Sequence, residues 1–211
     1  MGLQIQTIES LPFYENTYIV WNGQDCVVVD PGLEPDLILD FLQQKQLRPV
    51  AILNTHGHAD HIAGNQTLKD AFPAIRLLIG VGDAPLLRDP ELNVSRMFGF
   101  DLLSPPADQH VREGEQLLFA GITFDIYDVP GHSPGHVAFY IRAANAVFSG
   151  DVLMQGGFGR TDFPGGSWPQ LVQSITAKLF TLPEETVVYP GHGPTTTIGH
   201  ERRTNPILTM K

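Results

Sequence analysis

The chain has 211 residues, 42% of them hydrophobic and 17% charged, which is enough apolar material for one folded domain over residues 1–211. Lys and Arg number 13 against 23 Asp and Glu, for a formal net charge of −10, and this balance argues against a nucleic-acid partner because a phosphate backbone requires a basic face. No apolar run approaches the roughly 18 residues of a membrane span and the N-terminus lacks the pattern of a secretory signal, so the sequence predicts a cytoplasmic protein with no membrane partner.

The first half of the chain is predicted to alternate strands and helices. Its predicted elements are a β-hairpin over 18–21 and 26–30 with Asn22-Gly23 at the turn, a helix over 34–46, a strand over 50–54, a helix over 60–72 and a strand over 76–80. Cys26, the single cysteine, lies in the hairpin, so a buried thiol is expected and an internal disulfide is excluded.

The second half repeats this alternation. Its predicted elements are a hairpin over 116–129, strands over 136–141, 146–149 and 186–189, and a helix that begins after Ser167. The hairpin is expected to turn near Gly121, and Ser167 is a candidate N-cap for the helix, which carries Leu171, Ile175 and Leu179 on one face. Residues 81–112 show no clear pattern.

The two halves share one layout. In the first, a strand ends at Asp30, a helix follows, and the next strand leads to His56. In the second, a strand leads to Asp151, a helix follows, and the next strand leads to His192. Two such halves facing each other would give paired sheets with helices outside and a site along the strand ends.

The segment from Thr55 to His61 carries four candidate metal ligands within six positions, directly after a predicted buried strand. In an extended loop His56 and His58 project to the same side, because side chains alternate with period two. As the chain turns into a helix, Asp60 and His61 can point toward a second centre. Two metal ions so placed could activate one shared water.

Three further candidates, His132, Asp151 and His192, each lie at or just after a predicted strand end and beside glycine. Glycine allows the backbone to approach a ligand closely. Together with the first cluster they make five histidines and two aspartates, enough for two adjoining metal sites.

This pattern, from Asp30 through the His56–His61 cluster to His192, resembles the metallo-β-lactamase superfamily and covers most of the chain. The resemblance implies an α/β fold, a four-layer αβ/βα sandwich of two facing mixed sheets with outer helices. It also implies two divalent metal ions, for which histidine and aspartate ligands accept Zn, Fe or Mn.

The resemblance also implies a role for each matching residue. The implied ligands are His56, His58 and His132 at the first metal ion, Asp60, His61 and His192 at the second, and Asp151 between them. Asp60 and His61 complete the pair of sites and are therefore assigned to catalysis. Asp30 would orient a ligand histidine, and His136 either does the same or is a buried structural residue. His110 and His200 are expected at the surface.

The ligand set and the flanking motifs indicate the reaction. The common dinuclear β-lactamases carry Cys where this chain has Asp151, which favours a dinuclear hydrolase of another kind. Residues 130–136 and 149–153 resemble type II glyoxalases (hydroxyacylglutathione hydrolases), which cleave the thioester S-lactoylglutathione. The resemblance implies attack by a metal-bridging hydroxide, whose formation two cations favour by lowering the pKa of water.

Residues 156–166 and 199–208 are similar to short, single-domain bacterial members of this family, of the YcbL type. Only 19 residues follow His192, so we expect no C-terminal helical glutathione-binding domain. Arg160 is the candidate to bind the glycyl carboxylate of a glutathione conjugate, and an exposed or ion-paired loop arginine is the alternative. The expected partner is a small-molecule thioester, and the chain is expected to be a monomer or a small homo-oligomer.

Two other activities stay open. Residues 159–163 also resemble persulfide dioxygenases, oxidoreductases that keep one iron on two His and one Asp, although His136 stands where those enzymes usually carry Cys. A lactonase with the same ligand set is the other alternative.

Overall fold

Strand β3 (Asp25–Val29) shows how the central strands of this protein are buried on both faces. Val27 and Val29 belong to the hydrophobic cluster between two sheets, whereas Cys26 and Val28 pack with helices on the outer side. Because side chains alternate along a strand, a continuous apolar run fits a strand between two apolar layers. Burial raises the pKa of the Cys26 thiol to about 12, and the expected buried free cysteine is confirmed.

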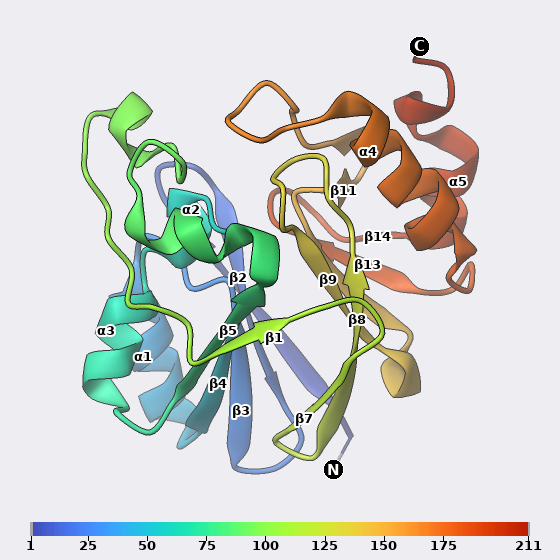
Figure 1. The fold of residues 1–211 in the computed structure, drawn as a ribbon. Coiled ribbons are helices and arrows are strands. Elements are labelled where there is room, and N and C mark those ends of the chain that lie inside the picture. The colour runs from blue at the N-terminus through green and yellow to red at the C-terminus, as the bar shows by residue number, and fades with distance from the viewer. Residues whose placement is uncertain (1, 211) are drawn as a thin grey trace.

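The computed structural model describes residues 2–210 and contains two six-stranded sheets that face each other (Figure 1). The first sheet has the order β1 (Gln4–Ser10), β2 (Glu15–Trp21), β3, β4 (Arg48–Asn54), β5 (Arg76–Gly80), β6 (Gln109–Val111). Its first three strands are antiparallel and the following pairs are parallel. Its outer face packs against α1 (Pro35–Lys45) and α3 (Asn65–Ala71).

The second sheet comes from the C-terminal half. Its order is β14 (Thr196–Thr197), β13 (Val187–Pro190), β10 (Ala146–Gly150), β9 (Val137–Ile141), β8 (Ile122–Asp128), β7 (Gln116–Phe119). Only the β10–β13 pair is parallel. The outer face packs against α4 (Trp168–Gln173), the helical turns that follow it, and α5 (Ile198–Thr204). A separate small hairpin pairs β11 (Leu153–Met154) with β12 (Gly157–Phe158).

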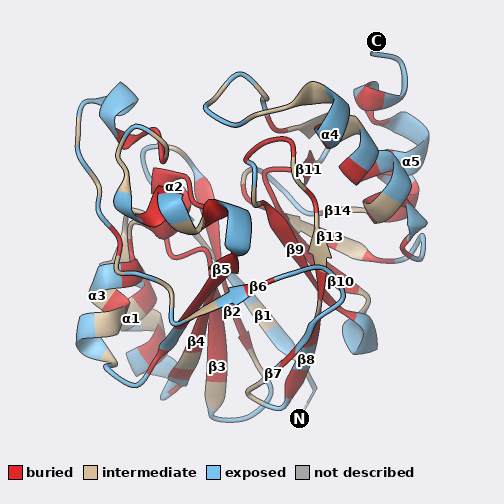
Figure 2. Cartoon of the chain, in the orientation of Figure 1, coloured by how far each residue is buried: buried red, intermediate tan, exposed pale blue. Residues whose placement is uncertain are grey.

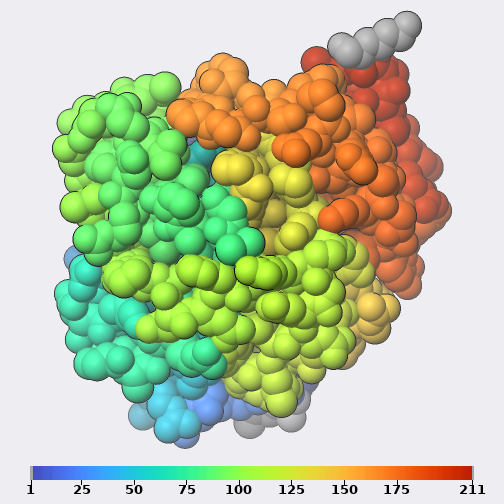
Figure 3. Space-filling model, in the orientation of Figure 1, coloured from blue at the N-terminus to red at the C-terminus, as the bar shows by residue number. Residues whose placement is uncertain are grey.

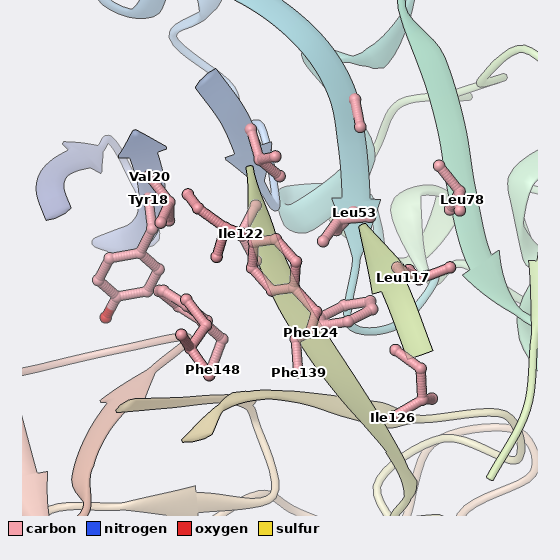
Figure 4. Close-up of a cluster of buried hydrophobic side chains, with 14 of the residues drawn as sticks. Tyr18, Val20, Leu53, Leu78, Leu117, Ile122, Phe124, Ile126, Phe139 and Phe148 are labelled. Carbon is pink, nitrogen blue, oxygen red and sulfur yellow. The ribbon is translucent and has the colours of Figure 1, made fainter. Parts of the chain in front are cut away.

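The space between the two sheets is filled by side chains from both. Phe124, Phe139 and Phe148 of the second sheet pack with Tyr18 and Leu53 of the first (Figure 4). In Figure 2 the central strands are buried along most of their length, and exposed residues concentrate on the helices and loops. The expected four-layer sandwich of two facing sheets with outer helices is confirmed.

The helix predicted over 60–72 is wrong as one element, because the structure breaks it into α2 (Ala59–Ile62) and α3. The break lies at Gly64, whose N–H donates to the Pro31 carbonyl over 2.8 Å. A Cβ on Gly64 would come within 2.9 Å of the Pro31 Cβ. Close packing on the loop after β3 therefore overrides the helical pattern.

The predicted helix after Ser167 begins as α4 but continues as a π-helical turn, Ser174–Lys178, and a 3-10 turn, Leu179–Thr181. Ser167 occupies the N-cap position without a capping bond from its side chain. The hairpin at Gly121 is confirmed, with Ala120 and Gly121 both at positive φ. The edge strands β1, β6 and β14 and the helix α5 were not predicted.

None of the helices in residues 2–210 combines the length and the apolar character that a membrane crossing requires.

The inter-sheet cluster predicts a clear stability contrast within one hairpin. Phe124 on β8 is fully buried, whereas Leu118 on β7 is 70% exposed. We expect Phe124→Ala to lower the free energy of unfolding by about 3–5 kcal/mol, because it leaves a cavity in the core. Leu118→Ala is the matched control and should change it by no more than about 0.5 kcal/mol. Urea unfolding followed by circular dichroism measures both, and equal losses would contradict this account of the core.

Candidate metal centre

Most of the candidate ligands lie on loops that directly follow strands, and Asp60 and His61 lie in the short helix α2 (Ala59–Ile62). His56 and His58 follow β4, His132 lies between β8 and β9, Asp151 follows β10, and His192 follows β13. In Figure 1, α2 and β11, which adjoin two of these loops, face each other above the sheets. The predicted location of the site along the strand ends therefore agrees with the structure.

The first group of candidate ligands consists of three buried histidines, His56, His58 and His132. One ligand atom from each lies within 4.8 Å of the others. The His58 Nδ1 and His132 Nε2 atoms are 2.9 Å apart. These two nitrogens therefore face the same point, where one cation could bind both rings.

The second group consists of Asp60, His61 and His192 and meets the same distance limit. Oδ2 of Asp60 lies 3.3 Å from His192 Nε2 and 3.7 Å from His61 Nε2. Its three donor atoms come from two sites that are distant in sequence, the start of α2 and the loop after β13.

Asp151 lies between the two groups. Its Oδ1 is 3.4 Å from His61 Nε2, while its Oδ2 is 3.5 Å from His132 Nε2 and 3.5 Å from His192 Nε2. One carboxylate therefore faces both groups, in the position expected of a bridging ligand.

In three of the histidines Nε2 faces the other candidate ligands, and Nδ1, on the opposite side of the ring, is bonded to an oxygen acceptor. The bonds run from His61 Nδ1 to Asp30 Oδ2 (3.1 Å), from His132 Nδ1 to the Arg160 carbonyl (2.7 Å) and from His192 Nδ1 to the Phe13 carbonyl (3.1 Å). A carbonyl only accepts, so Nδ1 must carry the hydrogen and the neutral ring keeps a lone pair on Nε2. The surroundings thus select the tautomer that binds a metal through Nε2.

Asp30 also accepts hydrogen bonds from Thr55, in addition to the bond from His61. Its Oδ1 accepts from the Thr55 N–H over 2.7 Å and its Oδ2 accepts from the Thr55 hydroxyl over 2.6 Å. Asp30 itself has φ +48°, so the strand β3 ends in a left-handed turn that aims the carboxylate at the cluster. This geometry is what the predicted orienting role requires.

His136 forms no hydrogen bond to a candidate ligand ring within the described residues and instead bonds to the backbone of Asp151. Its Nε2 accepts from the backbone N–H of Asp151 over 3.2 Å, and its ring stacks on His56 with centroids 4.7 Å apart. His136 therefore holds the backbone of the loop that carries Asp151. His110 and His200 are exposed, as expected.

Burial and charge divide the histidines into two electrostatic classes. Burial and the neighbouring His61 lower the pKa of His56 well below its usual value, and burial with His132 lowers the pKa of His58 to about 3. Burial also disfavours charge on His61 and His192, but Asp60 and Asp151 outweigh it and raise the pKa values to about 10 and about 11. Cations that bind the second group must therefore displace protons.

The donor chemistry fits a pair of divalent cations. His56 Nε2, His61 Nε2 and Asp151 Oδ1 are buried and have no hydrogen-bond partner within the described residues. A buried polar atom without a partner is costly, and coordination to a cation satisfies each of these atoms. Imidazole and carboxylate donors suit zinc, iron and manganese.

Asp83, which the sequence analysis did not identify, connects the two loops that carry the first group. Its carboxylate accepts from the Gly57 N–H (2.9 Å), the Ser133 hydroxyl (2.6 Å) and the Gly135 N–H (2.5 Å). Burial raises the pKa of Asp83. The residue lies in the region 81–112, where no sequence pattern indicated a role.

Asn16, also not identified from the sequence, holds the loop of His192. Its side-chain amide donates to the carbonyls of Pro190 (3.1 Å) and Gly193 (2.8 Å), and its N–H donates to the Gly191 carbonyl (2.7 Å). The hydroxyl of Tyr18 donates to the same Pro190 carbonyl over 2.6 Å. The start of β2 therefore fixes a ligand loop more than 170 positions away in sequence.

A cavity of about 260 Å³ opens above the ligands. Its apolar lining residues are Phe13, Val94, Phe98, Met154, Phe158 and Phe163. In Figure 3 the residues near 80–100 (green) and near 160–175 (orange) form two sides of the upper part of the molecule, and the cavity lies between these segments. A larger hollow of about 550 Å³, lined by Leu3 and Arg142 among others, contains none of the candidate ligands.

Arg160 lines the same cavity but belongs to neither group of candidate ligands. Its guanidinium forms an ion pair with Asp162 through two contacts of 2.5 Å and lies 4.2 Å from the ring centroid of Phe163. The Arg160 side chain is 57% exposed, so it remains accessible to a substrate.

The sequence profile of the Metallo-beta-lactamase superfamily matches residues 11–192, and the chain belongs to this superfamily. The probable metallo-hydrolase YqgX of Bacillus subtilis is 41% identical over 199 residues, which cover 93% of this chain and 93% of that protein. The hydroxyacylglutathione hydrolase GloC of Haemophilus influenzae is 34% identical over 212 residues, which cover 99% of this chain and 100% of that protein.

Solved structures agree with the fold. The BLEG-1 B3 metallo-beta-lactamase superposes with a TM-score of 0.94 at 39% identity, over 98% of this chain and 100% of that one. TTHA1623 in a di-iron-bound form superposes with a TM-score of 0.86 at 41% identity, over 95% and 98%. ETHE1 from Myxococcus xanthus superposes with a TM-score of 0.79 at 29% identity, over 96% and 83%. The di-iron relative supports a centre of two metal ions, while the metal itself stays open.

The geometry predicts what loss of one carboxylate does to metal content. Asp60→Ala removes a donor from the second group only, so we expect the variant to retain one metal ion where the unmodified protein retains two. Elemental analysis after extensive dialysis measures the ratio. Asp70→Ala is the control, because Asp70 is an exposed carboxylate that bonds only to Gln66 on α3. Two retained ions in the Asp60 variant would show that Asp60 is not a ligand.

Proposed function

We propose that this member of the metallo-β-lactamase superfamily is a dinuclear metal-dependent hydrolase that cleaves a thioester such as S-lactoylglutathione. The observation that carries the proposal is the Asp151 carboxylate, whose Oδ2 lies 3.5 Å from one histidine of each group, His132 and His192, and whose Oδ1 lies 3.4 Å from His61. The similarity over the whole chain to a hydroxyacylglutathione hydrolase supports the same reaction. The residues proposed to hold the two ions are His56, His58 and His132 for one, Asp60, His61 and His192 for the other, and Asp151 for both.

Two bound divalent cations would supply a hydroxide at neutral pH and an electrophile for the thioester carbonyl. The chain contributes the orientation of the donors, through the acceptors on the far nitrogens of His61, His132 and His192. The aromatic side chains Phe13 and Phe98, with ring centroids 4.8 Å apart, line one side of the cavity.

The cavity offers no separate general acid. Among the described residues that line it, the only carboxyl groups are Asp60 and Asp151, which already belong to the proposed ligand set. A thiolate leaves without one, because the pKa of a thiol is about 8.5. An alkoxide leaving group has a far higher pKa and needs protonation, so the lining residues favour a thioester over a simple ester.

Arg160 is proposed to bind the glycyl carboxylate of the glutathione part. Its planar guanidinium can contact a carboxylate through two hydrogen bonds, and its stacking on Phe163 fixes its direction at the edge of the cavity. Asp162 already occupies part of this donor surface. A substrate carboxylate must therefore share or displace Asp162, which limits the affinity that Arg160 can supply.

Turnover of several substrates measured together with metal content tests the proposal. The panel contains S-lactoylglutathione, glutathione persulfide, a simple lactone and a β-lactam, the last because a similar structure carries a β-lactamase name. We expect the highest kcat/KM on the thioester, in protein that holds two metal ions. Persulfide oxidation by protein with one iron would overturn the proposal in favour of the dioxygenase, and the highest kcat/KM on the lactone would favour the lactonase.

Arg160→Ala tests the proposed carboxylate contact. We expect the KM for S-lactoylglutathione to rise about three- to tenfold, with a smaller change in kcat, because an exposed and shared ion pair contributes little. A lactoyl thioester whose thiol part has no carboxylate is the matched control, and its KM should not change. Equal increases in KM for both thioesters would show that Arg160 does not bind the substrate carboxylate.

A further inference from the structure

Glu201 of α5 is a fully buried carboxylate that faces the small β11–β12 hairpin. Its Oε2 accepts from the Gly156 N–H over 3.0 Å and from the side-chain amide of Asn205 over 2.8 Å. The same amide donates to the Gly157 carbonyl over 3.0 Å. Glu201 and Asn205 therefore bind a backbone N–H and a backbone carbonyl of the hairpin, at its turn and the start of β12. Oε1 of Glu201 accepts from the Thr196 hydroxyl of β14 over 2.6 Å, a bond that involves no atom of the hairpin.

The hairpin needs such an anchor. It has only two residues in each strand, and β11 and β12 pair only with each other. A two-stranded hairpin of this size is not stable by itself in water. Its position is therefore set by what it packs on and by its bonds to α5.

The hairpin forms part of the cavity wall. Met154 of β11 and Phe158 of β12 line the cavity, and the chain leads directly from Phe158 to Arg160. The Arg160 carbonyl accepts from the ligand ring of His132 over 2.7 Å. A Cβ on Gly159 would lie 2.7 Å from the same ring and closer still to the Asp151 carbonyl. A shift of the hairpin would therefore move both the apolar wall and the candidate carboxylate contact.

We propose that Glu201, together with Asn205, is a positioning residue that sets substrate affinity by fixing the β11–β12 hairpin against the cavity. The reaction on which this acts is the thioester hydrolysis proposed above. Asp83 gives the loops of His58 and His132 a second support that does not involve α5, because its hydrogen bonds go to Gly57, Ser133 and Gly135. Loss of the bonds from α5 should accordingly change substrate binding more than metal binding.

Three variants separate positioning from general loss of stability. Glu201→Ala removes all bonds to the hairpin from this side chain. Glu201→Gln is the conservative variant, because its amide oxygen can accept from Gly156 while its NH₂ group donates to the Thr196 hydroxyl. Thr196→Val breaks the buried Thr196–Glu201 bond, which does not touch the hairpin.

We expect Glu201→Ala to raise the KM for S-lactoylglutathione about tenfold, with kcat and metal content nearly unchanged, because misplaced wall residues weaken substrate contacts. Hydrogen exchange in the peptide 153–163, followed by mass spectrometry, should become faster in the same variant. Glu201→Gln should restore both properties. Thr196→Val should lower the melting temperature and leave both the KM and the exchange of this peptide unchanged.

An unchanged KM in folded Glu201→Ala would overturn the inference, as would equal KM increases in Glu201→Ala and Thr196→Val. If Glu201→Ala does not fold, Asn205→Ala replaces it, since it removes the bond to Gly157 and leaves the Glu201–Gly156 bond in place. If the unmodified protein cleaves no thioester, the proposed function fails, and the exchange measurement decides the positioning role alone. Exchange that is equally slow in Glu201→Ala and the unmodified protein would then refute it.

Discussion

Hydrogen-bond acceptors behind three of the proposed ligand imidazoles, those of His61, His132 and His192, organise this structure. When a metal ion binds one nitrogen of an imidazole, an acceptor on the other nitrogen fixes the tautomer and the direction of the ring. His192 finds it in the carbonyl of Phe13 and His132 in the carbonyl of Arg160. The turn before β2 and the segment after β12 are therefore parts of the metal centre as well as walls of the cavity.

Without bound cations, this cluster of buried polar groups lowers the stability of the folded protein. Five imidazole rings and two carboxylates, carried by segments that follow strands of both sheets, lie close together, and several of their polar atoms are buried without partners among the described residues. The favourable free energy comes from elsewhere, chiefly from the apolar layer between the sheets, where Phe124, Phe139 and Phe148 are fully buried. Bound metal ions add stability that grows with the logarithm of the ratio of their free concentration to their dissociation constant. The sandwich is thus the rigid support that lets loops hold an otherwise unfavourable arrangement.

The sequence predicted the features that depend on local pattern and missed those that depend on distant contacts. Apolar runs identified the central strands, and the His56–His61 spacing identified the cluster that the structure brings together with His132, Asp151 and His192. Asp83, Asn16 and Glu201 were missed because each acts through backbone groups far away in sequence. The break near Gly64 has the same origin, since Pro31 lies more than thirty positions earlier. The edge strand β1 was missed because it is mostly exposed and lacks an apolar run.

The charge at the floor of the cavity changes when metal ions replace protons. The neighbouring histidines hold the pKa values of Asp60 and Asp151 low despite burial, so both are ionised, while His61 and His192 have pKa values of about 10 and about 11 and carry protons in the absence of metal. Two protons then balance two carboxylates, and Arg160 is balanced by Asp162. Replacement of the two protons by two divalent cations makes the floor more positive by two charges. Metal loading therefore adds positive charge where the proposed glutathione conjugate would bind, and a cleft focuses the charges that line it, which offsets locally the net charge of −10 of the whole chain.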